Sequence, residues 1–366
     1  MSPCRLWYVG EMDKPSEAND VVAGTSTNHP ATNHPVTNNS AIRPSDETRL
    51  AGSQVAEAFA GRPLTTEDLT SPPPRRVILP AVLFVVTCLS TFWAGASLWT
   101  GWGGGTEGSM LSYPNHLRWM VVAHWQEGFI YMVAVLAILL AHEMGHFVAT
   151  LYYRIPASLP FFIPFPISPI GTMGAVIGMA GSRADRKQIF DIGIAGPLAG
   201  LVLAIPMLVY GVKQIDFSVP VRGPLAFDCP LLMRWFVAWF HPDYAGHTQI
   251  AGSQLNPLIM ASWVGLLITG LNMMPISQLD GGHVTYALFR RRAHAVARGF
   301  LLFAVVFVVV FAPHWAIMVV LVALIGTDHP PTANDRVPLG WFRTALGVVS
   351  LAIPILCFPP QALIAM

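Results

Sequence analysis

Residues 129–153 read FIYMVAVLAILLAHEMGHFVATLYY, and this stretch decides the fold. It is long enough to cross the ~30 Å hydrocarbon core of a bilayer as one helix. It nevertheless contains His142, Glu143 and His146, side chains that are costly in lipid unless they face the interior of a protein. The stretch therefore predicts a membrane-spanning helix with functional polar side chains that face the interior of the protein.

The composition of the whole chain agrees with a membrane protein. Hydrophobic residues make up 53% of the 366 residues and charged residues only 11%, against about 25% charged in a typical soluble protein. The net charge of +1 argues against nucleic-acid binding, because no basic surface is available for phosphates. We expect an all-α polytopic protein with about six transmembrane helices, whose partner is the lipid bilayer. The apolar blocks are residues 77–99, 129–153, 192–212, 258–274, 300–325 and 341–356.

The N-terminal region differs from the rest in composition. Residues 1–74 are rich in Ser, Thr, Asn, Pro and Ala, and they hold too little apolar surface to form a core. We therefore expect a disordered cytoplasmic tail at 1–74 and a membrane-embedded domain at 75–366. The four cysteines form no CxxC pair, so the sequence indicates neither a thiolate zinc site nor a disulfide framework.

Arginine and lysine residues predict the orientation in the membrane, since positively charged loops tend to stay in the cytoplasm. Arg75 and Arg76 precede the first apolar block, and Arg290, Arg291 and Arg292 follow the fourth. A further basic group, residues 154–187, follows the second. Residues 100–117 contain no Lys or Arg and are expected outside. The apolar stretch 231–240 is too short to span and is expected in the interface.

His142 and His146 are four residues apart, which places them on one face of a helix where both can bind one zinc ion. Glu143 is beside them and can reach a water at the metal without being a ligand itself. Two histidines that hydrogen bond between helices are the structural alternative.

A zinc site needs at least one more protein ligand. In NMMPISQLDGGH at residues 272–283, an apolar block meets a proline, an aspartate and two glycines, which should end or unwind the helix. Asp280 is the best candidate for the third ligand, because it lies at the same predicted membrane depth as His146. Asp280 as a turn residue facing water is the alternative, and His283 is a second candidate ligand.

HExxH followed by NxxPxxxLDGG resembles the two motifs of the site-2 protease family of intramembrane zinc proteases. The runs 171–177 (GTMGAVI) and 195–200 (AGPLAG) are similar to the family's membrane-embedded hairpin and to the start of its next core helix, so the resemblance covers about residues 127–290. It implies one zinc ion per chain, bound by His142, His146 and Asp280. It also implies that Glu143 is the general base and that Asn272 assists catalysis.

Two segments around the core are also informative. Residues 155–169 contain five prolines and are expected to re-enter the membrane as a loop, so that 171–181 could offer a strand edge to a substrate. A plain connecting loop is the alternative. Residues 213–254 are too few for a domain of about 100 residues, so we expect a form that lacks the PDZ domain of many relatives.

The expected function is hydrolysis of peptide bonds within or near the transmembrane segments of membrane-anchored proteins. An intramembrane metal transporter and an inactive substrate-binding relative are the alternatives. A bacterial cell membrane, with the active site toward the cytoplasm, is the expected location, and an organelle membrane is the alternative.

Overall fold

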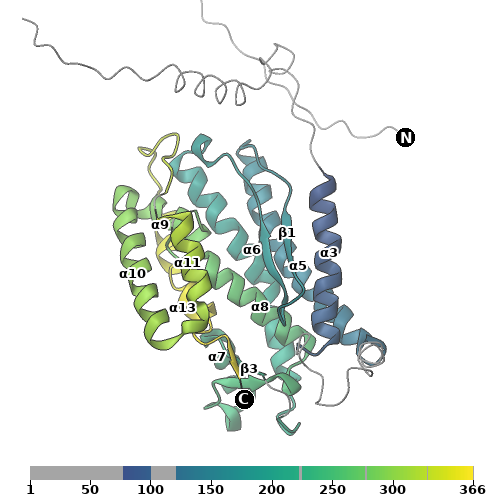
Figure 1. Cartoon of the computed structure of the whole chain (residues 1–366). Coiled ribbons are helices and arrows are strands. Elements are labelled where there is room, and N and C mark those ends of the chain that lie inside the picture. The colour runs from purple at the N-terminus through teal and green to yellow at the C-terminus, as the bar shows by residue number, and fades with distance from the viewer. Residues whose placement is uncertain (1–76, 100–120, 222–224, 277, 328, 366) are drawn as a thin grey trace, which may run out of the picture. The chain divides into compact units, whose positions relative to one another are not determined.

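The computed structural model describes residues 77–99, 121–221, 225–276, 278–327 and 329–365. Within these residues the chain is mostly helical, as predicted (Figure 1). The expected tail at 1–74 and the loop 100–117 lie outside the described residues, so the division into a tail and a membrane domain stays a prediction. The α-helices are α3 (Ile78–Ala96), α5 (Trp125–Tyr152), α6 (Arg186–Lys213), α7 (Leu231–Phe240), α8 (Pro257–Asn272), α9 (Asp280–Phe289), α10 (Ala293–Phe311), α11 (Ala316–Ile325), α12 (Trp341–Ser350) and α13 (Ile353–Cys357).

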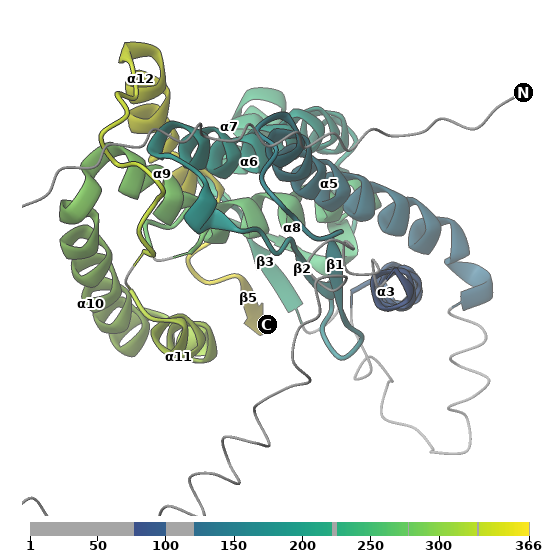
Figure 2. The same cartoon turned by 90° about the horizontal axis from the view of Figure 1, so that it is seen from above.

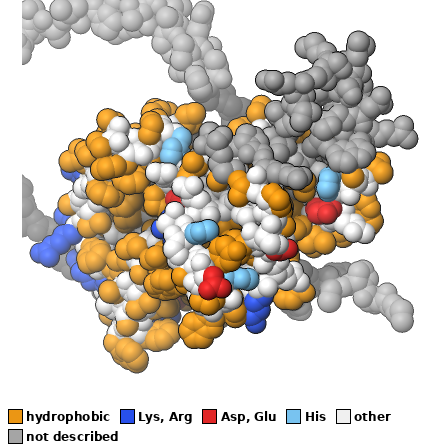
Figure 3. Space-filling model, turned by 90° about the horizontal axis from the view of Figure 1, so that it is seen from below, with side chains coloured by type: hydrophobic (Ala, Val, Ile, Leu, Met, Phe, Trp, Pro, Cys, Tyr) orange, Lys and Arg blue, Asp and Glu red, His pale blue; other side chains and the backbone are white. Residues whose placement is uncertain are grey.

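Among the described residues, four helical segments are long and apolar enough to cross a membrane: α3, α5, α6 and the run Asp280–Phe311 formed by α9 and α10. They make the chain an integral membrane protein. Hydrophobic side chains also cover most of the described surface in the view from below (Figure 3). The predicted count of six spans is not confirmed, because α8 has only 16 residues and the last two blocks are interrupted.

The block predicted at 300–325 is not one helix. Helix α10 ends at Phe311, a 3-10 turn begins at Pro313, and α11 starts at Ala316. Proline has no N–H to donate and clashes with the preceding turn, so the chain reverses there. Helix α11 has 10 residues and is about 15 Å long, half of the hydrocarbon core. The block at 341–356 is likewise divided between α12 and α13.

Helix α5 lies at the centre of the bundle. It packs against α3, α6 and α8, while α10 and α11 stand on the side away from α3 (Figures 1 and 2). Small residues allow the central helices to approach closely, as is common between membrane helices. A Cβ at Gly145 of α5 would lie 2.5 Å from the carbonyl oxygen of Ala195 in α6, so these backbones touch directly.

The proline-rich segment forms part of a hairpin of β1 (Phe161–Phe165) and β2 (Gly171–Val176), which pair antiparallel with an irregularity between Phe162 and Pro164. The hairpin is attached to α5, since Tyr131 Oη donates to the Ile170 carbonyl at 2.7 Å. A hairpin is therefore present where the sequence predicts one. Its re-entry into the membrane is not confirmed.

A second small sheet is formed by β3 (Leu225–Asp228), which pairs with β4 (Gln249–Ala251) on one side and with β5 (Leu363–Ala365) on the other. The segment predicted in the interface is α7. The described residues of the loop 213–254 form β3, α7, β4 and short 3-10 turns, with no further domain among them.

Candidate metal centre

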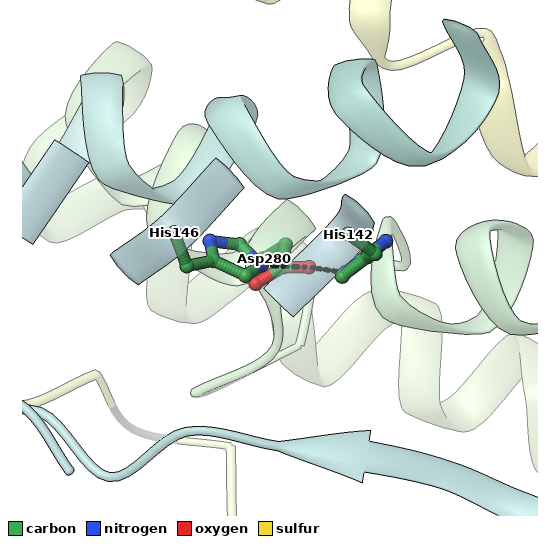
Figure 4. Close-up of side chains that lie close together, drawn as sticks. All are labelled: His142, His146 and Asp280. Carbon is green, nitrogen blue, oxygen red and sulfur yellow. Dashed lines mark hydrogen bonds and ion pairs between the residues drawn. The ribbon is translucent and has the colours of Figure 1, made fainter. Parts of the chain in front are cut away.

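The structure brings together His142, His146 and Asp280, which are up to 138 residues apart in sequence (Figure 4). The two histidines project from one face of α5, and Asp280 is the first residue of α9. Asp280 Oδ2 lies 3.2 Å from His142 Nε2 and 3.3 Å from His146 Nε2. The two histidines of one motif and the aspartate of the other, predicted to share one site, therefore meet at the same depth in the bundle.

These three side chains fit a zinc ion. Their ligand atoms all lie within 4.8 Å of one another. Ligands about 2.0–2.1 Å from a tetrahedral zinc ion stand about 3.3 Å apart, close to the two distances that Asp280 makes. His146 Nδ1 lies 2.7 Å from the Ile192 carbonyl oxygen, which can only accept. Nδ1 therefore carries the hydrogen, and Nε2 of the neutral ring is left with a lone pair for a metal.

Two glycines of α6 make room for the histidines. A Cβ at Gly196 would lie 2.1 Å from His146 Nε2, and a Cβ at Gly200 would lie 3.3 Å from His142 Nδ1. Gly196 and Gly200 are four residues apart, as are His142 and His146, so each glycine faces one histidine across the α5–α6 contact. The run AGPLAG thus has a direct part in shaping the site.

The break between α8 and α9 places Asp280. Helix α8 ends at Asn272, and α9 begins at Asp280 after a non-helical segment, as the sequence predicts. Gly281 lies against the end of α8, because a Cβ there would be 2.0 Å from the Met273 carbonyl oxygen. Only glycine allows this approach, which holds the start of α9 beside the histidines.

Glu143 and Asn272, predicted as base and assisting residue, line the same cavity. The cavity has a volume of about 150 Å³, and one wall is β2 with the residue after it, Ile177. Glu143 is 4% exposed. Asn272 Nδ2 lies 3.4 Å from His142 Nε2. The roles assigned to all five residues stay predictions, but the chain folds so that they share one space.

His283, the second candidate ligand, is in a different position. Its ring lines the cavity, yet it is outside the group of close ligand atoms. His283 Nδ1 instead lies 2.7 Å from Nε2 of His329, a residue that sequence reasoning did not single out.

The sequence-based predictions do not assign Gly196 and Gly200 the role of making room for the histidines. Their matched spacing with the histidines was available as a signal. The carbonyl of Ile192 and the contact with His329 carry no such signal, because a backbone acceptor has no side-chain code and His329 is 46 residues from its partner.

A buried His-His-Asp site with a glutamate beside it, between apolar helices of membrane-spanning length, defines a membrane-embedded metalloprotein of the HExxH class. The model of the family described as "Peptidase family M50" matches residues 130–312, half of the chain. The chain belongs to this family, which is the site-2 protease family that the motifs indicate.

Curated relatives are similar over the same region. A rice (Oryza sativa subsp. japonica) protein named "Probable zinc metalloprotease EGY1, chloroplastic" is 32% identical over 232 residues, 62% of this chain and 39% of its own length. The Arabidopsis thaliana protein of the same name is 31% identical over 232 residues, with 62% and 42% covered. An Arabidopsis thaliana EGY2 is 31% identical over 155 residues, with 41% and 27% covered. The chain thus spans about two fifths or less of the length of these relatives. Zinc is the metal that their names and the His-His-Asp cluster support.

Proposed function

We propose that this chain is an intramembrane zinc protease that hydrolyses peptide bonds within or near the transmembrane segments of membrane-anchored proteins. The observation that carries the proposal is the meeting of His142, His146 and Asp280 in one cavity with Glu143. The family membership of residues 130–312 supports it.

The side chains divide the chemistry among them. His142, His146 and Asp280 would hold the zinc ion, which would act as a Lewis acid that polarises a carbonyl and lowers the pKa of water. Glu143 removes a proton from the attacking water and passes it to the leaving amine. The Asn272 amide, whose Nδ2 lies 3.4 Å from His142 Nε2, would donate to the carbonyl oxygen of the substrate, where negative charge develops.

The hairpin is the proposed substrate-binding element. Among the described residues, β2 pairs with β1 only, and Ala175, Val176 and Ile177 line the cavity. An unwound substrate segment would add to the free edge of β2 as an extended strand, with its backbone satisfied by strand hydrogen bonds. This arrangement needs a hairpin that re-enters the membrane, and we propose that it does, within a bundle of about six membrane-crossing segments.

The proposed orientation follows from the basic residues. The HExxH end of α5, the start of α6 at Arg186 and the group Arg290–Arg292 after α9 are near one end of the bundle (Figure 1). By the positive-inside rule this end faces the cytoplasm or its equivalent. The proposed location is limited to an integral membrane, because the relatives are named as chloroplastic and do not favour a bacterial cell membrane.

Two substitutions separate the protease from its alternatives. Glu143→Gln keeps the shape of the site and removes the base, so zinc should stay near one per chain while cleavage of a membrane-anchored substrate falls by orders of magnitude. Asp280→Ala removes a ligand, so zinc content and cleavage should fall together. Metal analysis and a cleavage assay on purified protein test both.

The control outcomes are distinct. A transporter would move metal into liposomes and cleave nothing, and both substitutions would reduce the flux. An inactive relative would bind zinc and substrate with no turnover in the wild type. Cleavage at the wild-type rate by Glu143→Gln would show that the base is assigned incorrectly.

A further inference from the structure

Two buried histidines lie next to the metal centre and outside its ligand set. His283 is on α9, one turn after Asp280, and His329 belongs to the segment between α11 and α12. Both are 7% exposed. The family match ends at residue 312, so His329 lies beyond the region that defines the family.

The position of His329 is fixed by several contacts. The ring of Tyr286, on α9, stacks on it with centroids 4.2 Å apart. Tyr286 Oη in turn donates to Asp335 Oδ2 at 2.9 Å, and the backbone N–H of Ala333 donates to the carbonyl of Ala184 at 2.9 Å. The segment that carries His329 is therefore held against both α9 and the residues before α6.

The hydrogen bonds of this pair determine which ring nitrogen carries each proton. His329 Nδ1 lies 2.6 Å from the Pro330 carbonyl oxygen, which can only accept, so Nδ1 carries the hydrogen. Burial holds the pKa of His329 below its usual value, which favours the neutral ring. Nε2 of His329 is then an acceptor, and His283 Nδ1, 2.7 Å away, must donate to it.

His283 presents a hydrogen-bond acceptor to the cavity. With Nδ1 protonated, Nε2 of the neutral ring is an acceptor, and this ring lines the cavity that also holds Glu143 and Asn272. Only alternate backbone N–H groups of a peptide added to β2 face that strand, so the others lose water in this cavity and need another acceptor. His142 and His146 are the rings that would hold the metal, and Glu143 serves the attacking water, so His283 is the remaining ring in the cavity that can accept.

We propose that His283 Nε2 accepts a hydrogen bond from a backbone N–H of the bound peptide, and that His329 is a positioning residue that fixes the required tautomer of His283. This inference rests on the proposed function, since it concerns how that site holds its substrate. The contribution of His329 comes from a segment outside the family match.

Two substitutions at residue 329 test the inference in the full chain carrying Glu143→Gln, which retains substrate. In His329→Met the acceptor for His283 Nδ1 is lost, so the His283 proton can move to Nε2 and the cavity gains a donor. Dissociation constants for a transmembrane peptide should rise about tenfold, the effect of one hydrogen bond. His329→Gln places an amide oxygen where Nε2 stands and should restore binding to within about twofold of the parent.

Two further measurements do not depend on catalysis. Zinc content should be the same in all three proteins. The ¹⁵N spectrum of labelled histidine should show an unprotonated Nε2 at His283 in the parent and in His329→Gln, and a protonated Nε2 in His329→Met. Equal peptide affinity in the two variants, or a protonated His283 Nε2 in the parent, would overturn the inference. Tight binding of a peptide that the wild type never cleaves would instead contradict the proposed protease function and leave this inference standing.

Discussion

Helices α5 and α10 are both apolar enough to cross a membrane, yet they have opposite surroundings. In the most apolar window of α5, 50% of the residues are buried within the protein, against 11% in the window of the α9–α10 run. Helix α5 carries His142, Glu143 and His146, and α6 meets it with glycines, whereas most of α10 faces outward with Val, Leu and Phe. Hydrophobicity therefore indicates which segments enter the membrane, and small and polar residues indicate which of them build the site.

The same glycine substitution should abolish function at the α5–α6 contact and have almost no effect in α10. Gly196→Ala puts a Cβ 2.1 Å from His146 Nε2, and the ring cannot keep its position between α5 and α6. We expect zinc binding and cleavage to be lost together, a fall of at least about a hundredfold in activity. Metal analysis and the cleavage assay measure both.

Gly299→Ala in α10 is the matched control, because nothing lies within 4 Å of a Cβ at that position. It should leave zinc and cleavage unchanged and favour the helix slightly. A zinc-loaded, active Gly196→Ala protein would show that the α5–α6 contact is looser than this packing implies.

A smaller effect is expected at the edge of the bundle, where α12 is attached to α6 by an ion pair. Arg343 donates to Asp191 through Nε at 2.7 Å and through Nη2 at 2.9 Å, and Tyr153 Oη donates to the same carboxylate. Arg343→Ala should lower the free energy of unfolding by about 1–2 kcal/mol, because the ion pair is bidentate and partly buried. Thermal unfolding in detergent measures this.

Arg343→Lys keeps the charge and loses the bidentate geometry, so its stability should lie between that of the wild type and that of Arg343→Ala. Zinc content should not change in either variant, because Asp191 and the metal ligands are separate groups. A loss of zinc in Arg343→Ala would mean that α12 supports the metal centre and is not peripheral.

The sequence predicts features that depend on neighbouring residues, and it does not predict those that depend on contacts between distant segments. His142 and His146 are four residues apart, and Asp280 follows a visible break in an apolar block, so local patterns were enough to find the three residues that meet. The sequence does not predict the reversal at Pro313, because the apolar block continues through it and its length indicates one span. His329 was not singled out, because its contact with His283 depends on how a distant segment folds back.

The smallest predicted effect is on stability, and it differs between the same substitution at a buried and at an exposed valine. Val135 in α5 is 0% exposed and Val309 in α10 is 75% exposed. In a membrane the exposed valine contacts lipid tails, which are as apolar as a protein interior, so burial as such contributes little and packing decides the difference. Val135→Ala leaves a cavity between close-packed helices and should cost about 1–2 kcal/mol. Val309→Ala exchanges lipid contact for lipid contact and should cost less than about 0.5 kcal/mol. Equal losses in the two variants, measured by thermal unfolding in the same bilayer mimic, would show that α10 is covered by protein.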